Sequence, residues 1–114
     1  MLLIDEDDRV LLFRYTDRGR FLWCPVGGGV EAGESVAQAA RREIVEETGF
    51  LTTIDLVDVG RRHIVATWLG QLTDIREHWF LARVPHGDVD RSGWSVLERE
   101  TITAYRWWLS LIHI

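Results

Sequence analysis

The chain has 114 residues, of which 46% are hydrophobic and 27% are charged, and its net charge is −5 at pH 7. This length predicts one domain with a single core, and the hydrophobic content excludes a disordered chain. The acidic balance argues against a nucleic-acid polymer as partner, because sequence-independent binding of such polymers depends on many Lys and Arg contacts to phosphates.

The single cysteine, Cys24, is typical of a reducing compartment, so we expect a cytoplasmic protein. The first ten residues are acidic where a signal peptide needs a basic region, and no later stretch approaches the length of a membrane span. Neither export nor a membrane partner is therefore expected.

Short strands are predicted at the start of the chain. Apolar runs at 1–4 and 9–14 flank four acidic turn residues and predict a hairpin. A second turn at 17–20 precedes an extended segment at 21–23, which leads into three consecutive glycines at 27–29.

A helix is predicted over residues 36–48. Apolar residues recur at four-residue spacing from Val36 to Ile44, with charges on the other side. Ser35 fits the first position of a capping box, and Gly49 stands where a left-handed C-terminal cap would fall.

Three strands are predicted after this helix, over 51–59, 62–69 and 77–84, because these segments are rich in β-branched and aromatic residues. Gly60 and residues 70–74 are the predicted breaks between them. Strands on both sides of a central helix predict an α/β fold with a mixed sheet packed between helices.

A loop over residues 85–94 and a second helix are predicted next. Ser95 is the expected cap of that helix, which we expect to hold Leu97, Ile102 and Tyr105.

Three acidic residues crowd one face of the first predicted helix. Glu43, Glu46 and Glu47 stand at i, i+3 and i+4, where like charges repel each other and the dipole at the helix C-terminus disfavours them. Such a conflict with local rules is typical of a functional site, and clustered carboxylates are the ligands that Mg²⁺ prefers. A solvated acidic face paired with Arg41 and Arg42 is the alternative.

The acids belong to a longer pattern over residues 28–50. Its fixed and apolar positions are Gly28, Glu34, Arg42, Glu43, Ile44, Glu46, Glu47, Gly49 and Phe50. This pattern resembles the Nudix box, and the flanking segments resemble the wider Nudix hydrolase family, although many relatives carry Pro at the position of Val26. The resemblance implies an α/β/α sandwich and an enzyme that uses Mg²⁺, with Mn²⁺ as the alternative cation. The implied reaction is hydrolysis of a pyrophosphate bond in a small nucleotide-like molecule.

The resemblance also implies roles for particular residues. It makes Glu43, Glu46 and Glu47 metal ligands and catalytic residues, adds the carbonyl of Gly28 as a metal ligand, and leaves Glu34 and Arg42 structural. The glycines at 27–29 let the backbone approach a substrate, so Gly27, Gly28 and Gly29 are predicted substrate-binding residues.

The general base differs among relatives and stays open here. It is either a glutamate of the box or an acid outside it, for which Glu98 and Glu100 are the leading candidates and Glu77 is a third.

One tryptophan is expected to stack on a nucleobase, and the sequence does not show which of four candidates it is. The candidates are Trp23, Trp68, Trp79 and Trp94, of which Trp23 lies ahead of the glycine segment and is predicted to bind substrate. His63 and His78 lack metal-ligand spacing and are expected to pack or hydrogen-bond, and Cys24 lacks an activating partner.

Residues 1–108 are predicted to form the domain. The six residues at 109–114 resemble the translation of a transposon end used to prepare sequencing libraries, so we expect them to be non-native. Met1 falls inside an apparent strand, which indicates a shortened start as well.

Two other classes stay open beside the hydrolase. One is a module of the same fold that senses a nucleotide without cleaving it, and the other is an isomerase acting on an isoprenoid diphosphate. The choice between a monomer and a homodimer also stays open.

Overall fold

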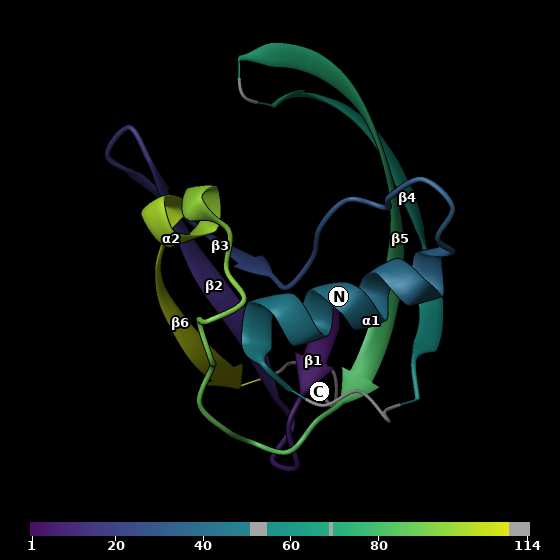
Figure 1. Ribbon diagram of the computed structural model, residues 1–114, viewed down its shortest axis with the longest axis vertical. Coiled ribbons are helices and arrows are strands. Elements are labelled where there is room, and N and C mark those ends of the chain that lie inside the picture. The colour runs from purple at the N-terminus through teal and green to yellow at the C-terminus, as the bar shows by residue number, and fades with distance from the viewer. Residues whose placement is uncertain (51–54, 69, 110–114) are drawn as a thin grey trace.

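A computed structural model of the chain describes residues 1–50, 55–68 and 70–109. The elements are β1 (Leu2–Ile4), β2 (Arg9–Asp17), β3 (Arg20–Pro25), α1 (Val36–Thr48), β4 (Val57–Trp68), β5 (Gln71–Arg83), α2 (Val96–Thr101) and β6 (Ile102–Leu109). The six strands form one mixed sheet, and α1 crosses in front of it in Figure 1. The predicted mixed sheet with a helix over 36–48 is confirmed.

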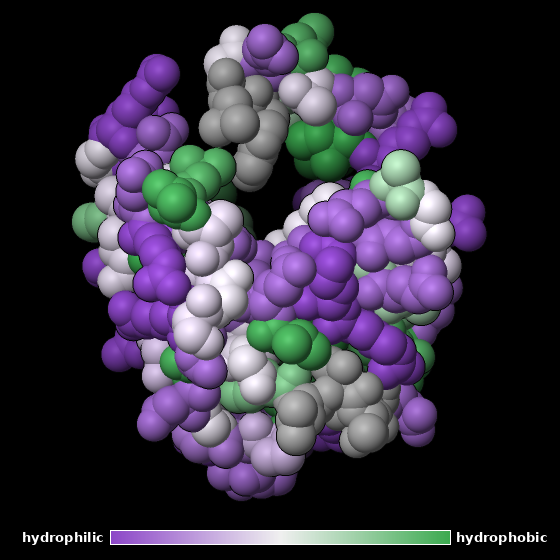
Figure 2. All heavy atoms as spheres, in the orientation of Figure 1, coloured by the Kyte–Doolittle hydropathy of each residue, from purple (hydrophilic) through white to green (hydrophobic). Residues whose placement is uncertain are grey.

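The short strand β1 joins the two halves of the sheet. It pairs antiparallel with β2 and parallel with β5, where Leu2 lies opposite Leu81. One half then consists of β3, β2 and β6, and the other half is the long β4–β5 hairpin. Because β1 has only three residues, the two halves diverge beyond it, and Figure 2 shows the surface hollowed between α2 and the outer part of that hairpin.

The core lies between α1 and one face of the sheet. Ala40 and Ile44 of α1 belong to the same buried cluster as Leu3, Phe80 and Ala82. Because successive strand residues point to opposite faces, Leu2, Trp79 and Leu81 project from the other side of the sheet. We call the two sides the α1 face and the opposite face.

Both ends of α1 are capped as predicted. Gln38 donates its backbone N–H to the Ser35 hydroxyl (3.1 Å) and its side chain accepts from the Ser35 N–H (2.7 Å). Gly49 is left-handed, with φ 75°, and donates its N–H to the Val45 carbonyl at 2.9 Å. These caps satisfy backbone groups that a helix leaves unpaired at its ends.

The strand break predicted at Gly60 is wrong, and the break predicted at 70–74 is present at Gly70 but does not extend to residue 74. Gly60 lies within β4 at a shift of register next to Asp58, with φ 130°, so the irregularity is accommodated as a bulge and the strand continues. The second turn is also shorter than predicted, because β5 begins at Gln71, directly after Gly70. Residues 51–54 of the first predicted strand lie outside the described residues.

The second helix is also shorter than predicted. Ser95 caps α2 through a capping box, but the helix ends at Thr101. Ile102 and Tyr105 lie in β6, where Tyr105 pairs with Phe13 of β2. Pairing with β2 therefore overrides the helical spacing of these apolar residues.

The last described residue, Leu109, ends β6 opposite Arg9, and the rest of the tail predicted at 109–114 lies outside the described residues. Among the described residues, neither helix has the length and apolar character needed to cross a membrane.

The turn between β1 and β2 is organised around a buried carboxylate, that of Asp5. It accepts hydrogen bonds from the backbone N–H groups of Asp7 and Arg9 and from Arg9 Nε, all at 2.9 Å, and its second oxygen lies 2.9 Å from His86 Nδ1. Burial acts to raise the pKa of Asp5, but the bonds from the Arg9 backbone and His86 outweigh it, and the pKa lies below its usual range.

We expect Asp5→Asn to lower the free energy of unfolding by about 1–3 kcal/mol at pH 7, because the buried donors lose their charged acceptor. The folded-state pKa of Asp5 is depressed, so its contribution is present above the unfolded value of 3.8 and is lost as the pH falls through the folded one. The difference between variant and wild type, measured by urea denaturation, should therefore shrink below about pH 4. Asp7→Asn, on the exposed side of the same turn, is the control. A deficit that persists unchanged at pH 3 would contradict this role.

Candidate active site

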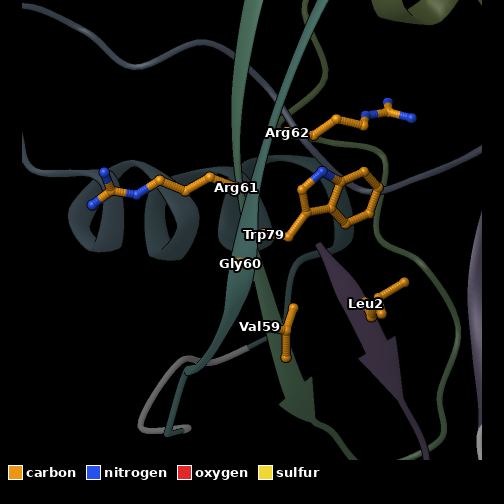
Figure 3. Close-up of a pocket in the computed structure, with 6 residues that line it drawn as sticks. All are labelled: Leu2, Val59, Gly60, Arg61, Arg62 and Trp79. Atoms are coloured by element: carbon orange, nitrogen blue, oxygen red, sulfur yellow. The ribbon is translucent and has the colours of Figure 1, made fainter.

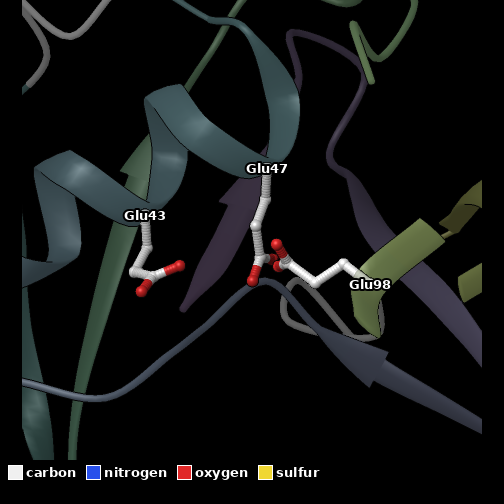
Figure 4. Close-up of side chains that lie close together, drawn as sticks. All are labelled: Glu43, Glu47 and Glu98. Carbon is white, nitrogen blue, oxygen red and sulfur yellow. The ribbon is translucent and has the colours of Figure 1, made fainter. Parts of the chain in front are cut away.

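Three carboxylates from two elements converge beside the hollow. Glu43 and Glu47 lie one turn apart on α1, and Glu98 reaches toward them from α2. One oxygen from each lies within 4.8 Å of the others. Figure 4 shows the carboxyl groups of Glu47 and Glu98 meeting, with Glu43 one turn earlier on the helix. Glu47 is 2% exposed, so this is not a solvated acidic face.

The loop before α2 is fixed to the end of α1, which explains how Glu98 reaches the site. The indole of Trp94 donates from Nε1 to the Glu47 carbonyl at 2.6 Å, and Asp90 donates its N–H to the Thr48 carbonyl at 2.9 Å. Gly93 lies so close to Glu46 that an added Cβ would stand 2.6 Å from the Glu46 carbonyl oxygen. Trp94 was a candidate for base stacking, but its ring is buried and holds the helix end instead.

Glu98 is held by the cap of its own helix. Its Oε1 accepts the Ser95 N–H at 2.8 Å, and its backbone N–H donates to the Ser95 hydroxyl at 3.2 Å. The capping box therefore orients the carboxyl group that contacts Glu47. Glu98 was one of the two leading candidates outside the box, and its spacing from Ser95 is the sequence signal for this capping box.

Ionisation of Glu43 and Glu47 is unfavourable in this cluster. Burial, followed by contact with Glu98 and repulsion from Glu43, raises the pKa of Glu47 to about 9. Burial also raises the pKa of Glu43. The Oε2 atom of Glu47 is buried and has no hydrogen-bond partner among the described residues. An unpartnered buried oxygen among further carboxylates fits a hard divalent cation, which supplies the missing positive charge.

Glu46 does not join the three converging acids. It is about half exposed, and its carboxylate pairs with Arg42 at 3.2 Å. Arg42 also donates to Glu43 at 2.8 Å, to the Gly29 carbonyl at 2.8 Å and to Glu34 at 2.7 Å. The expected structural roles of Arg42 and Glu34 agree with these contacts, which tie the glycine loop to α1.

Gly28 leaves room for the Glu43 carboxylate. A Cβ added there would lie 2.1 Å from Glu43 Oε1, whereas a Cβ on Gly27 or Gly29 would meet nothing within 4 Å. The requirement for glycine at 28 is thus steric, and the glycine loop lies directly against an acid of the cluster.

The remaining candidates lie elsewhere. Glu100 is exposed on α2 and is not part of the cluster, and Glu77 on β5 accepts two hydrogen bonds from Arg62, at 2.8 and 3.1 Å. Trp23 on β3 packs edge-on against Trp108, with ring centroids 5.3 Å apart.

His63 and His78 have the hydrogen-bonding roles expected of them. Their Nε2 atoms lie 2.5 Å from Asp74 and 2.7 Å from Asp58, respectively. Burial raises the pKa of Cys24, which is consistent with an unactivated thiol.

Tyr15, whose pKa is affected by the acid cluster, was not predicted from the sequence. Tyr15 on β2 is half-buried, and burial followed by the negative charges of Glu47, Cys24 and Glu98 raises its pKa. Nothing in the local sequence distinguishes this tyrosine from an ordinary strand residue, since its position depends on where α2 docks.

Comparison with known proteins identifies the family. Residues 1–114 match the family model of the NUDIX domain, so the chain belongs to the Nudix family. It is 31% identical over 100 residues to an RNA pyrophosphohydrolase of Sphingopyxis alaskensis, covering 79% of this chain and 63% of that protein. It is 36% identical over 83 residues to an oxidized purine nucleoside triphosphate hydrolase of Danio rerio, covering 72% of this chain and 51% of that one.

Solved structures agree with this assignment. The dihydroneopterin triphosphate pyrophosphohydrolase of E. coli superposes with a TM-score of 0.74 at 25% identity, covering 95% of this chain and 76% of that one. The chain spans about 63% of the length of the RNA pyrophosphohydrolase that it matches.

We expect Gly28→Ala to displace the Glu43 carboxylate without unfolding the protein, because the clashing atoms are the end of a flexible side chain. The affinity for Mg²⁺, measured by calorimetry, should fall roughly 10- to 100-fold, as for the loss of support to a metal ligand. Gly29→Ala is the matched control and should keep the wild-type affinity. Equal affinities for both variants would contradict the steric role of Gly28.

The stability of the metal-free protein should fall as the pH rises. The pKa of Glu47 is raised from 4.5 to about 9 in the folded state, so its favourable contribution is present below pH 4.5 and is lost as the pH rises toward 9. Thermal unfolding in EDTA between pH 5 and 9 should show this decline, and Glu47→Gln should flatten it. A wild-type profile as flat as that of the variant would show that Glu47 is ionised without cost.

Proposed function

We propose that this chain is a Mg²⁺-dependent hydrolase that cleaves a pyrophosphate bond in a small nucleotide-type substrate. The observation that carries the proposal is the convergence of Glu43, Glu47 and Glu98, with a buried Glu47 oxygen that lacks a partner among the described residues. A charge conflict of this kind does not stabilise the fold, so a bound cation and its anionic ligand would account for it.

Glu43 and Glu47 would hold the cation, with Glu46 and the Gly28 carbonyl as the further ligands that the Nudix box implies. A bound Mg²⁺ or Mn²⁺ supplies charge neutralisation for the diphosphate and for the leaving oxygen. The backbone of the glycine loop at 27–29 lies beside Glu43 and is open to a ligand at Gly27 and Gly29. These glycines can therefore contact the phosphates without an intervening side chain.

Glu98 is the general base in this proposal. It is the acid outside the box that meets the cluster, whereas Glu100 is exposed and Glu77 is held by Arg62. The carboxylate of Glu98 accepts a proton from water while the water oxygen forms a bond to phosphorus and the bridging P–O bond breaks. Its capping bond to Ser95 keeps one oxygen engaged and the other directed at the site.

The substrate class rests on the family and on charge. The names of the relatives refer to pyrophosphohydrolases of RNA and of dihydroneopterin triphosphate and to a hydrolase of oxidized purine nucleoside triphosphates, and each triphosphate carries a phosphoanhydride. The net charge of −5 favours a small substrate over a polymer, because binding a polymer needs many phosphate contacts to cationic residues.

Hydrolysis tests the proposal directly. Phosphate release should be followed over nucleoside triphosphates, ADP-ribose, dinucleoside polyphosphates and a 5′-triphosphate RNA, with Mg²⁺, with Mn²⁺ and with EDTA. We expect cation-dependent cleavage of a small nucleotide, and Glu46→Gln together with Glu47→Gln should keep the fold and reduce kcat at least ~100-fold. Full activity of this double variant would refute the assignment, and binding without cleavage would favour the sensing module.

A second comparison tests the identity of the base. Glu98→Gln keeps an oxygen for the Ser95 cap, so we expect an intact fold and a kcat reduced by roughly 10²- to 10⁴-fold. Glu100→Gln, on the same helix, should behave as wild type. If Glu100→Gln loses activity and Glu98→Gln does not, the general base is Glu100.

A further inference from the structure

The loop at 91–94 and the helix α2 form one hydrogen-bonded unit, which we call the loop–α2 unit. Arg99 on α2 donates from Nε to the Trp94 carbonyl at 3.3 Å, and its Nη2 lies 3.2 Å from the Arg91 carbonyl and 3.3 Å from the Ser92 carbonyl. Trp94 also donates its backbone N–H to the Arg91 carbonyl at 3.1 Å. Glu98 lies in the first turn of the same helix, so its position relative to the loop is fixed.

The loop–α2 unit contacts α1 at the residue that carries the most buried acid of the cluster. A helix leaves the carbonyls of its last turn without partners inside the helix. The indole of Trp94 reaches one of them, because its Nε1 donates to the Glu47 carbonyl at 2.6 Å in a buried hydrogen bond. Trp94 stands four residues before Glu98, so this bond connects the main chain of Glu47 to the helix that carries Glu98. Figure 4 shows the carboxyl groups of these two acids meeting.

The hydrogen bond, and not the packing of the ring, requires tryptophan at position 94. The ring is 6% exposed and packs edge-on against Phe13, with ring centroids 5.7 Å apart. The Arg91 guanidinium lies 5.3 Å from the centroid of the Trp94 ring. A phenyl ring could make both contacts, whereas the indole also brings a donor to the carbonyl of Glu47.

Two other indoles bond away from the acid cluster. Trp107 donates from Nε1 to the Gly87 carbonyl at 3.1 Å. Trp79 donates to Glu77 at 2.8 Å, beside a depression on the opposite face of the β4–β5 hairpin (Figure 3). Of these three indoles, that of Trp94 is the one that bonds a member of the acid cluster.

A second contact keeps the loop close to α1. Gly93 lies so near to Glu46 that an added Cβ would stand 2.6 Å from the Glu46 carbonyl oxygen and 3.2 Å from its Cα. Both atoms belong to the backbone, so rotation of a side chain could not relieve the clash. Loss of either contact would shift the loop–α2 unit, and Glu98 with it, relative to α1. A displacement of ~1 Å at a catalytic group lowers a rate by about 100-fold.

We propose that Trp94 is a positioning residue, which holds Glu98 against Glu47 through the bond from its indole to the Glu47 carbonyl. This inference rests on the proposed function, in which Glu47 is a metal ligand and Glu98 is the general base, and makes that function more specific. Trp94 contacts neither the substrate nor the cation in this arrangement. It acts on the reaction by fixing the distance between the two carboxyl groups.

Matched removal of one indole N–H tests the assignment. Trp94→Phe keeps the aromatic ring and removes the donor, so we expect kcat for the best substrate of the hydrolysis panel to fall by roughly 10- to 100-fold, with little change in KM. Trp107→Phe removes an indole bond to another backbone carbonyl, that of Gly87, and should keep the wild-type kcat. Equal kcat values for wild type and Trp94→Phe, or equal losses in both variants, would overturn the inference.

A double variant shows whether Trp94 acts through Glu98. The effects of two independent substitutions on kcat multiply, whereas those of two residues that act as one unit do not. We therefore expect Trp94→Phe to have little further effect on kcat when it is added to Glu98→Gln. If the two losses multiply, Trp94 does not act through Glu98 and the inference fails.

A steric variant perturbs the same docking contact without changing Trp94. Gly93→Ala should push the loop away from the Glu46 carbonyl and lower kcat as Trp94→Phe does. Gly87→Ala, in the same connection between β5 and α2, is the control, because its Cβ would meet Phe50 at an ordinary distance of 3.7 Å. A wild-type kcat for Gly93→Ala would contradict the need for close docking.

Hydrogen exchange gives a readout that does not depend on catalysis or on a bound cation. In EDTA, Trp94→Phe should speed amide exchange within α2 and leave exchange in β2 and β5 at wild-type rates, because the contact opens locally. Trp107→Phe should leave exchange in α2 unchanged. Mass spectrometry of peptides from these segments measures both effects. Faster exchange throughout the chain would overturn the inference, because the bond would then stabilise the fold as a whole.

The two kinds of measurement keep this inference separate from the proposed function. If wild type hydrolyses no compound of the panel but exchange in Trp94→Phe rises within α2 alone, the docking contact stands and the hydrolase proposal fails. If hydrolysis occurs and Trp94→Phe keeps the wild-type kcat, the hydrolase proposal stands and Trp94 is not a positioning residue.

Discussion

The repulsion among buried carboxylates is the constraint on which the rest of this structure depends. Glu47 is 2% exposed, lies against Glu98 and Glu43, and keeps one oxygen without a partner among the described residues. Its pKa of about 9 shows how unfavourable its ionisation is when no cation is present. In the proposed function, a divalent cation bound between the three carboxylates would remove their mutual repulsion, because each oxygen would then face a positive charge.

Several neighbours prevent the acids from moving apart. Arg42 links Glu43 to the glycine loop, and the indole of Trp94 fixes the last turn of α1 by bonding the Glu47 carbonyl. The Ser95 cap does the same for Glu98. Arg42 and the Ser95 N–H each engage one carboxylate oxygen, of Glu43 and of Glu98 respectively, and Trp94 engages a backbone carbonyl. In the proposed function, these bonds preorganise the carboxyl groups for a hard cation.

The split in the sheet places the acid cluster between two surfaces. Because β1 ends after three residues, the half of the sheet with β3 and the β4–β5 hairpin separate beyond it, and Figure 2 shows the surface hollowed between them.

Sequence alone determined α1, its caps and the family, because the spacing of Glu43, Glu46 and Glu47 and the signals at Ser35 and Gly49 all act within a few residues. Tertiary structure decided the rest of the site. It selected Glu98 over Glu100 and buried the indole of Trp94. It also ended α2 at Thr101 and carried β4 through Gly60. The physical reason is that these outcomes depend on contacts between segments far apart in the chain, where docking and strand pairing override local propensity.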